Sequence, residues 1–144
     1  MIEPDTIRLL RECDAGVKMG VASIDGVLDH VQNRNLKELL VSCKQEHEAL
    51  DREVQTLLDQ YHDDGKDPSP MAKGMSWMKT NMQLGMNESD QTIASLMTDG
   101  CGMGVKQLHK YLNQFKAADT ASKNVAKRLI HVEEQLTADM RQYL

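Results

Sequence analysis

The sequence predicts an all-α protein, an antiparallel four-helix bundle in a single domain over residues 1–144. Two observations support this prediction: apolar residues recur every three or four positions in two long segments, and only two residues separate the segments. The first stripe is Leu10, Asp14, Val17, Val21, Ile24, Leu28 and Val31; the second is Leu36, Leu40, Cys43, His47, Leu50, Val54, Leu57 and Tyr61. Such stripes bury one face of each helix, so the two helices are expected to pack together.

The first helix is expected over 5–32 and the second over 35–62, with Asn33 and Arg34 between them. The segment Asn35-Leu-Lys-Glu38 has the form of a capping box, which marks the start of a helix. A connection this short forces an antiparallel hairpin.

In such a hairpin, residues whose numbers sum to about 68 lie side by side, so His47 is expected opposite Val21 and Gly20. Asp14 lies about seven residues from that level, or roughly 10 Å along the helix. Asp14 and His47 are therefore not expected to be partners. Because Asp14 is near the open end of the hairpin, we expect it in solvated packing rather than as a buried acid.

The segment from Asp63 to Pro70 is rich in helix breakers and ends the second helix. Asn87 or Ser89 is expected to cap the third helix. The remaining expected elements are a crossover over 63–87 with a short helix at about 71–83, a third helix over 88–116 and a fourth over 122–143.

The length of the crossover predicts the topology. About a dozen helical residues at ~1.5 Å each and about ten extended residues at ~3.3 Å each span about 50 Å, whereas the main helices are about 40 Å long. The crossover can therefore run the whole length of the bundle. Two hairpins joined in this way have ferritin-like connectivity, with the second and third helices parallel.

Composition excludes several classes of partner. The chain has 17 Lys and Arg against 22 Asp and Glu, and only one Trp, three Tyr and one Phe, so a nucleic-acid-binding surface is not expected. No apolar run reaches the ~20 residues of a membrane span, and the first residues lack the features of a signal peptide. We expect a cytoplasmic protein without a membrane partner, whose three cysteines are reduced thiols packed as small apolar residues.

A ferritin-like di-metal centre needs a Glu-x-x-His motif on two helices. Lys44 stands three residues before His47, and His131-Val-Glu-Glu134 has the motif reversed, so neither segment matches and no cofactor is expected. If a metal ion does bind, the candidate ligands are His47, Cys43, Cys101, His131 and Glu134.

The alternative for His47 is a core histidine hydrogen-bonded to Asp51 or to a backbone carbonyl. On that interpretation, His47→Leu should fold and be at least as stable as the parent. His131 and Glu134 are interpreted alternatively as an exposed pair within the fourth helix.

Three glycines in the segment Gly100-Cys-Gly-Met-Gly104 are unusual inside a helix, because each costs about 1 kcal/mol relative to alanine. We expect Gly104 or Gly100 to point inward for close helix packing, in this chain or against a second one, and Gly102 to point outward; room for a bound ligand is the alternative. The crossover also contains five methionines, Met71, Met75, Met78, Met82 and Met86. We interpret them as core or oligomer contacts, with Cu(I) binding as the alternative.

The chain resembles an uncharacterised bacterial group of ferritin-like proteins, a domain of unknown function. The resemblance covers most of the length and rests on Leu9-Leu10 with Gly16-Val17, Gly74-Met-Ser-Trp77-Met-Lys79, Asp99-Gly100 and Tyr111-Leu112. It implies the ferritin-like fold. The acidic positions of that group fall here on Lys18, Lys44 and Cys101, so the resemblance does not imply ferroxidase, peroxidase or iron-storage activity.

The sequence contains no nucleophile with a base at fixed spacing and no phosphate-binding loop. We therefore expect a non-enzymatic bundle that acts through self-association, most simply as a homodimer, or by presenting a helix face to a protein partner. The alternative is a metal or small-ligand binder that uses His47, Cys43, Cys101 or the methionines.

Overall fold

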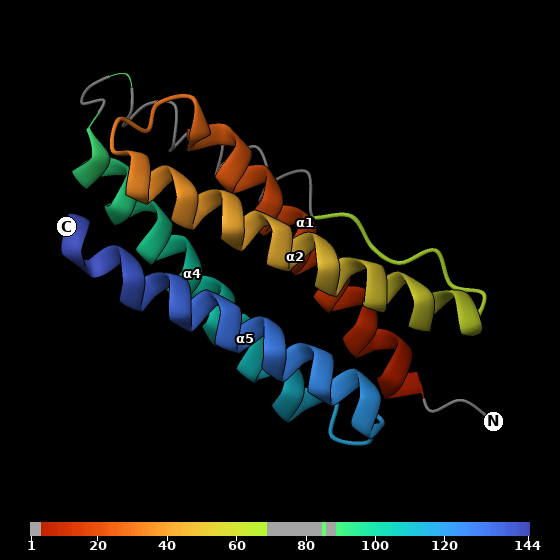
Figure 1. Ribbon diagram of the computed structural model, residues 1–144. Helices are drawn as coiled ribbons and strands as arrows, with labels where there is room; N and C mark the ends of the chain where they lie inside the picture. Colours follow the sequence, from red (N-terminus) through yellow and green to blue (C-terminus); the bar gives the residue numbers. More distant parts are fainter. Residues whose placement is uncertain (1–3, 69–84, 86–88) are drawn as a thin grey trace.

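Four helices make up the computed structural model, which describes residues 4–68, 85 and 89–144 (Figure 1). They are α1 (Pro4–Leu28), α2 (Arg34–Gln60), α4 (Asp90–Gln114) and α5 (Thr120–Met140), and a 3-10 helix, η1 (Arg141–Tyr143), follows α5. The all-α prediction is confirmed for these residues. None of the described helices combines the length and apolar character needed to cross a membrane. The crossover helix expected at 71–83, with its methionines Met71, Met75, Met78, Met82 and Met86, lies outside the described residues.

The turn between α1 and α2 is longer than predicted. Helix α1 ends at Leu28 rather than near residue 32. The prediction of a capping box at Asn35 was wrong, because Asn33 caps α2: its side-chain oxygen accepts a hydrogen bond from the backbone N–H of Leu36 at 3.1 Å.

Capping side chains also fix the starts of the other two helices. Ser89 caps α4 by accepting from the backbone N–H of Thr92, as predicted. Helix α5 starts at Thr120, slightly earlier than predicted, because Asp119 caps it by accepting from the backbone N–H of Ser122 at 2.8 Å.

Hydrogen bonds between turns show which helix ends lie together. The backbone N–H groups of Gln32 and Asn33 both donate to the Asp90 carboxylate at 2.9 Å, so α4 begins beside the α1–α2 turn. At the other end, the backbone N–H of Asp119 donates to the Thr6 hydroxyl at 2.9 Å, which places the α4–α5 turn beside the start of α1. Figure 1 shows the same arrangement, with α2 ending and α4 beginning at opposite ends of the bundle.

The apolar interior consists of two clusters separated along the bundle axis. One contains Leu9, Leu10, Cys13 and Val17 of α1 with Leu50, Val54 and Leu58 of α2, Leu108 of α4 and Val125, Ala126, Leu129 and Ile130 of α5. The other contains Ile24 and Val27 of α1 with Leu36, Leu40 and Cys43 of α2, Ile93, Met97 and Cys101 of α4 and Leu136 and Met140 of α5. The residues that lie in sequence between the two sets include Gly20 on α1, His47 on α2, Gly104 on α4 and Glu133 on α5.

Candidate functional site

The layer between the two apolar clusters is polar. His47 of α2 is only 2 % exposed, and its ring nitrogen Nε2 lies 3.7 Å from Oε1 of Glu133 on α5. The other ring nitrogen, Nδ1, is 2.8 Å from the backbone carbonyl oxygen of Cys43, one turn earlier in the same helix. A carbonyl oxygen can only accept, so Nδ1 carries a hydrogen and donates it. A backbone carbonyl was one of the two partners expected for His47.

Glu133 is the residue that the sequence analysis missed. Its side chain is buried, whereas His131 and Glu134, the candidates chosen from the reversed motif, are exposed. The signal was nevertheless in the sequence, because a second stripe with steps of four and three runs through Ser122, Ala126, Leu129, Glu133, Leu136 and Met140, all of which are buried.

Glycines on the other two helices make room for this polar pair. A β-carbon on Gly20 would lie 2.8 Å from His47 Nε2, and one on Gly104 would overlap Oε2 of Glu133. The expected proximity of Gly20 and His47 is thus confirmed. Of the two glycines considered for the inward position, Gly104 occupies it and contacts this chain's own Glu133, whereas a β-carbon on Gly100 would meet nothing within 4 Å.

Alanine substitutions at the three α4 glycines test this assignment. Gly104→Ala should lower the free energy of unfolding by roughly 1–3 kcal/mol through overpacking against Glu133. Gly100→Ala and Gly102→Ala should raise it by several tenths to about 1 kcal/mol, because both positions are exposed and alanine favours helix. Urea unfolding of the three variants measures these changes. Equal effects at Gly102 and Gly104 would contradict the inward assignment of Gly104.

Burial opposes protonation of His47, but its contacts with Cys43 and Glu133 outweigh that effect and raise the pKa of the ring to about 10. Burial and the negative charge of Glu133 raise the pKa of the Cys101 thiol to about 12. Two buried polar atoms in this layer, Nε2 of His47 and Oε2 of Glu133, make no hydrogen bond to any other described residue. His47 and Glu133 therefore lie close together, at 3.7 Å, without a direct hydrogen bond.

The described His, Cys, Asp and Glu side chains do not form a cluster of three that could hold a metal ion. The sulfur of Cys43 lies 3.5 Å from Nδ1 of His47, but that nitrogen already carries a hydrogen for the Cys43 carbonyl. Cys13, Cys43 and Cys101 are free and buried, which confirms the prediction that they pack as thiols.

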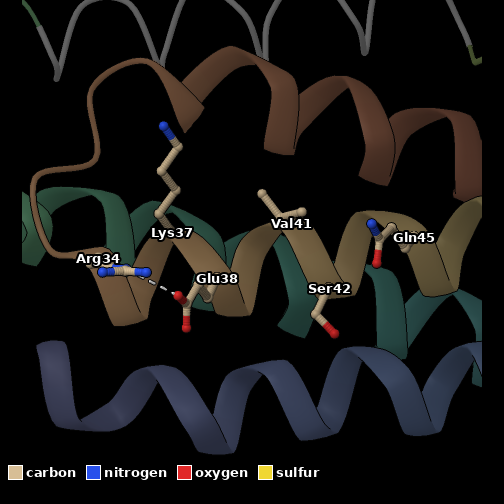
Figure 2. Close-up of a pocket in the computed structure, with 6 residues that line it drawn as sticks. All are labelled: Arg34, Lys37, Glu38, Val41, Ser42 and Gln45. Carbon is tan, nitrogen blue, oxygen red and sulfur yellow. Dashed lines mark hydrogen bonds and ion pairs between the residues drawn. The ribbon is translucent and has the colours of Figure 1, made fainter.

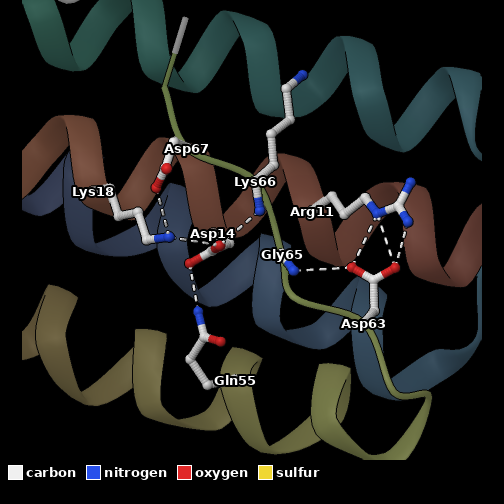
Figure 3. Close-up of polar contacts among 8 residues, drawn as sticks. All are labelled: Arg11, Asp14, Lys18, Gln55, Asp63, Gly65, Lys66 and Asp67. Carbon is white, nitrogen blue, oxygen red and sulfur yellow. Dashed lines mark hydrogen bonds and ion pairs between the residues drawn. The ribbon is translucent and has the colours of Figure 1, made fainter.

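A second polar cluster surrounds Asp14 near the other end of the α1–α2 hairpin (Figure 3). Asp14 is fully buried, so the prediction that it would be solvated was wrong. Its carboxylate accepts from the side-chain amide of Gln55 at 2.7 Å, from the backbone N–H of Lys66 at 2.9 Å and from the ammonium of Lys18 at 3.1 Å. These donors replace the solvent that a carboxylate otherwise needs.

The loop over 63–67 covers Asp14 by folding back along α1 (Figure 3). Gly65 has a φ of +82°, a left-handed conformation suited to glycine, and a β-carbon there would overlap Oδ2 of Asp14. Ion pairs fasten the loop to α1 on either side of Gly65: Arg11 with Asp63, Glu12 with Lys66 and Lys18 with Asp67.

Asp51 lies next to this cluster. Burial and the adjacent Asp14 carboxylate raise the pKa of Asp51 to about 7, and its Oδ1 is buried without a hydrogen-bond partner. Below that pH, Asp51 is a neutral carboxylic acid beside the Asp14 carboxylate. Because the pKa of Asp51 is raised from 3.8 to about 7, its contribution to stability is fully present below about pH 4 and is lost as pH rises to about 7, where two negative charges face each other.

The outer surface of the described helices is hollowed at two places that bear on function. Figure 2 shows the first, whose six lining side chains all come from α2, with α1 on one side and α5 on the other: Arg34, Lys37, Glu38, Val41, Ser42 and Gln45. The second, which we call the α2–α5 groove, is lined by Ala49, Arg52, Glu53, Thr56, Leu57, Ala121, Asn124, Val125 and Arg128. Neither is lined by the polar residues of the interior, so neither hollow brings a substrate to those residues.

Comparison of the chain with protein-family models, with curated proteins and with solved structures found no match. The arrangement of the polar side chains is therefore the guide to function. His47 and Glu133 face each other, Asp14 is enclosed by its donors, and the residues around the hollows are surface side chains.

Proposed function

We propose that this protein is a non-enzymatic bundle with ferritin-like connectivity and two antiparallel hairpins, which acts by associating with a second copy of itself through the α2–α5 groove. The connectivity is supported by the position of Asp90 beside the α1–α2 turn, because α2 ends at the other end of the bundle. The chain between α2 and α4 must therefore span the bundle's length, as a ferritin-like crossover does.

The groove supports self-association because a helix could rest on its apolar floor. Ala49 and Ala121 are small and exposed, and they let another backbone approach closely. Leu57, which is half-buried, adds apolar surface on α2, whereas Val125 lines the groove from the core and is only 3 % exposed. Apolar floors with charged rims are typical of protein interfaces.

The charges at the rim favour a second copy as the occupant. Twofold symmetry brings a surface against itself, so the surface must carry both charges to be its own complement. Arg52 and Glu53 are neighbours on α2, and Arg128 of α5 pairs with Glu53 at 2.6 Å across the groove. The side chains of Glu53 and Arg128 are each 51 % exposed, so both can exchange this contact for one with a second copy.

Sedimentation equilibrium of the full chain tests the proposal. We expect a dimer for the parent and a monomer of unchanged helicity for Ala49→Arg, which fills the groove with a charged side chain. Glu53→Lys should weaken the dimer by about tenfold or more, because it makes the rim uniformly positive. Ala138→Arg is the matched control, since Ala138 is exposed on α5 away from the groove, and it should remain dimeric.

A parent chain that stays monomeric at all concentrations would overturn the proposal. So would a dimer that survives Ala49→Arg and Glu53→Lys, because that dimer would use another face.

A further inference from the structure

The contacts of His47 require a proton between it and Glu133. Nδ1 already donates to the Cys43 carbonyl, so a neutral ring would turn the lone pair of Nε2 toward the Glu133 carboxylate, 3.7 Å away. Two acceptors facing each other in the interior repel, and burial removes the water that would otherwise screen them. A hydrogen on one of the two atoms converts this repulsion into attraction.

The hydrogen belongs on the ring. An imidazole ordinarily binds a proton about two pH units more tightly than a carboxylate does. Because Gly20 and Gly104 have no β-carbon, the His47 and Glu133 side chains occupy the space that β-carbons at these two positions would need.

We propose that His47 and Glu133 form a buried imidazolium–carboxylate pair that ties the α1–α2 hairpin to the α4–α5 hairpin, so that the joining of the hairpins depends on a proton held at His47 Nε2. The pair is the polar contact between α2 and α5 at the level where both apolar clusters end. It would select the arrangement of the two hairpins in which His47 meets Glu133, because any other rotation would bury one charge alone.

The other titratable groups near the pair do not replace either member. On α2 the neighbour is Cys43, whose carbonyl accepts the Nδ1 hydrogen, and on α4 it is Cys101, a thiol whose pKa is raised to about 12. From α1 the residue facing His47 is Gly20, which has no titratable group. Deprotonation at alkaline pH should therefore act through His47 itself.

Nitrogen NMR of the imidazole rings in the intact parent chain is the direct test. We expect both ring nitrogens of His47 to carry hydrogens at pH 7, and the ring to titrate about two pH units or more above the ordinary imidazole value of 6.5. A His47 ring with one unprotonated nitrogen at pH 7 would overturn the proposal, and this test does not depend on any variant folding.

Two matched variants identify the partner. Glu133→Gln should lower the titration midpoint of His47 toward the ordinary imidazole value of 6.5, whereas Glu134→Gln should leave it unchanged because Glu134 is exposed. An unchanged midpoint in Glu133→Gln would overturn the assignment of Glu133 as the partner.

The link to hairpin association has its own test. A pKa raised in the folded state means that stability is lost as pH rises through that pKa. The urea midpoint of the parent should therefore fall between pH 7 and about pH 10, and it should fall less in the double variant His47→Leu/Glu133→Leu, in which the remaining lysines and tyrosines still titrate. Equal pH dependence in the two proteins would overturn the proposal.

Discussion

Glu133→Ala is expected to lower the free energy of unfolding by about 3–5 kcal/mol at pH 7, because it removes the carboxylate partner of the His47 ring, which is 2 % exposed and must then either stay charged alone or give up its proton. Urea unfolding followed by circular dichroism measures the loss. Glu134→Ala, at the adjacent exposed position of the same helix, should change stability by less than about 0.5 kcal/mol. Equal losses for the two variants would contradict a buried pair.

The same pair revises the expectation for His47→Leu. From the heptad alone, leucine should stabilise the core, but the structure places the Glu133 carboxylate against this position. The single variant would bury that carboxylate without its partner and is now expected to be less stable than the parent. The double variant His47→Leu/Glu133→Leu should recover most or all of the loss, since apolar replacement of both members of a buried pair is often neutral or stabilising.

Asp14→Ala should lower the free energy of unfolding by roughly 2–3 kcal/mol, because it leaves the half-buried amide of Gln55 and the backbone N–H of Lys66 without the Asp14 acceptor. Lys18 contributes less to this loss, since its ammonium is about a third exposed and can be hydrated. Urea unfolding at pH 6, where Asp51 is mostly neutral, avoids a change in the repulsion between the two carboxylates.

Hydrogen exchange separates this local effect from a general loss of stability. The Lys66 amide should exchange faster in Asp14→Ala than the loss of global stability explains, because the loop at 63–67 loses its central hydrogen bond. Asp67→Ala is the matched control: it removes a carboxylate that is 88 % exposed and should cost less than about 1 kcal/mol without changing exchange at Lys66. Protection at Lys66 that survives Asp14→Ala would show that the ion pairs alone hold the loop.

Much of the helical framework was predictable from the sequence. The α2 stripe from Leu36 to Val54 is buried at every predicted position, because the direction of a side chain on a helix follows from its place in the repeat. The helix ends were less accurate: the cap at Asn33 was missed in favour of Asn35, since several polar residues in the turn can cap and only the backbone geometry selects one.

The candidate site shows the limit of that reasoning. On α5, two apolar stripes are compatible with a helix, and they differ only by rotation about its axis. One passes through Val132 and contains Val125, Leu129, Leu136 and Met140, and the other passes through Glu133. The choice between them depends on which neighbouring helices cover α5. The reversed motif drew attention to Glu134 because it lies three residues from His131, whereas burial selected Glu133.

Periodicity within each helix was enough to show that the chain is all-α and that His47 lies in the interior, because both follow from local spacing and the burial of apolar area. Only the tertiary structure paired His47 with Glu133 and enclosed Asp14. Those contacts bring together residues far apart in the chain, such as Asp14 and Lys66 at a separation of 52 positions. The electrostatics of a buried group are set by neighbours that the packing of separate segments supplies, and no local pattern encodes them.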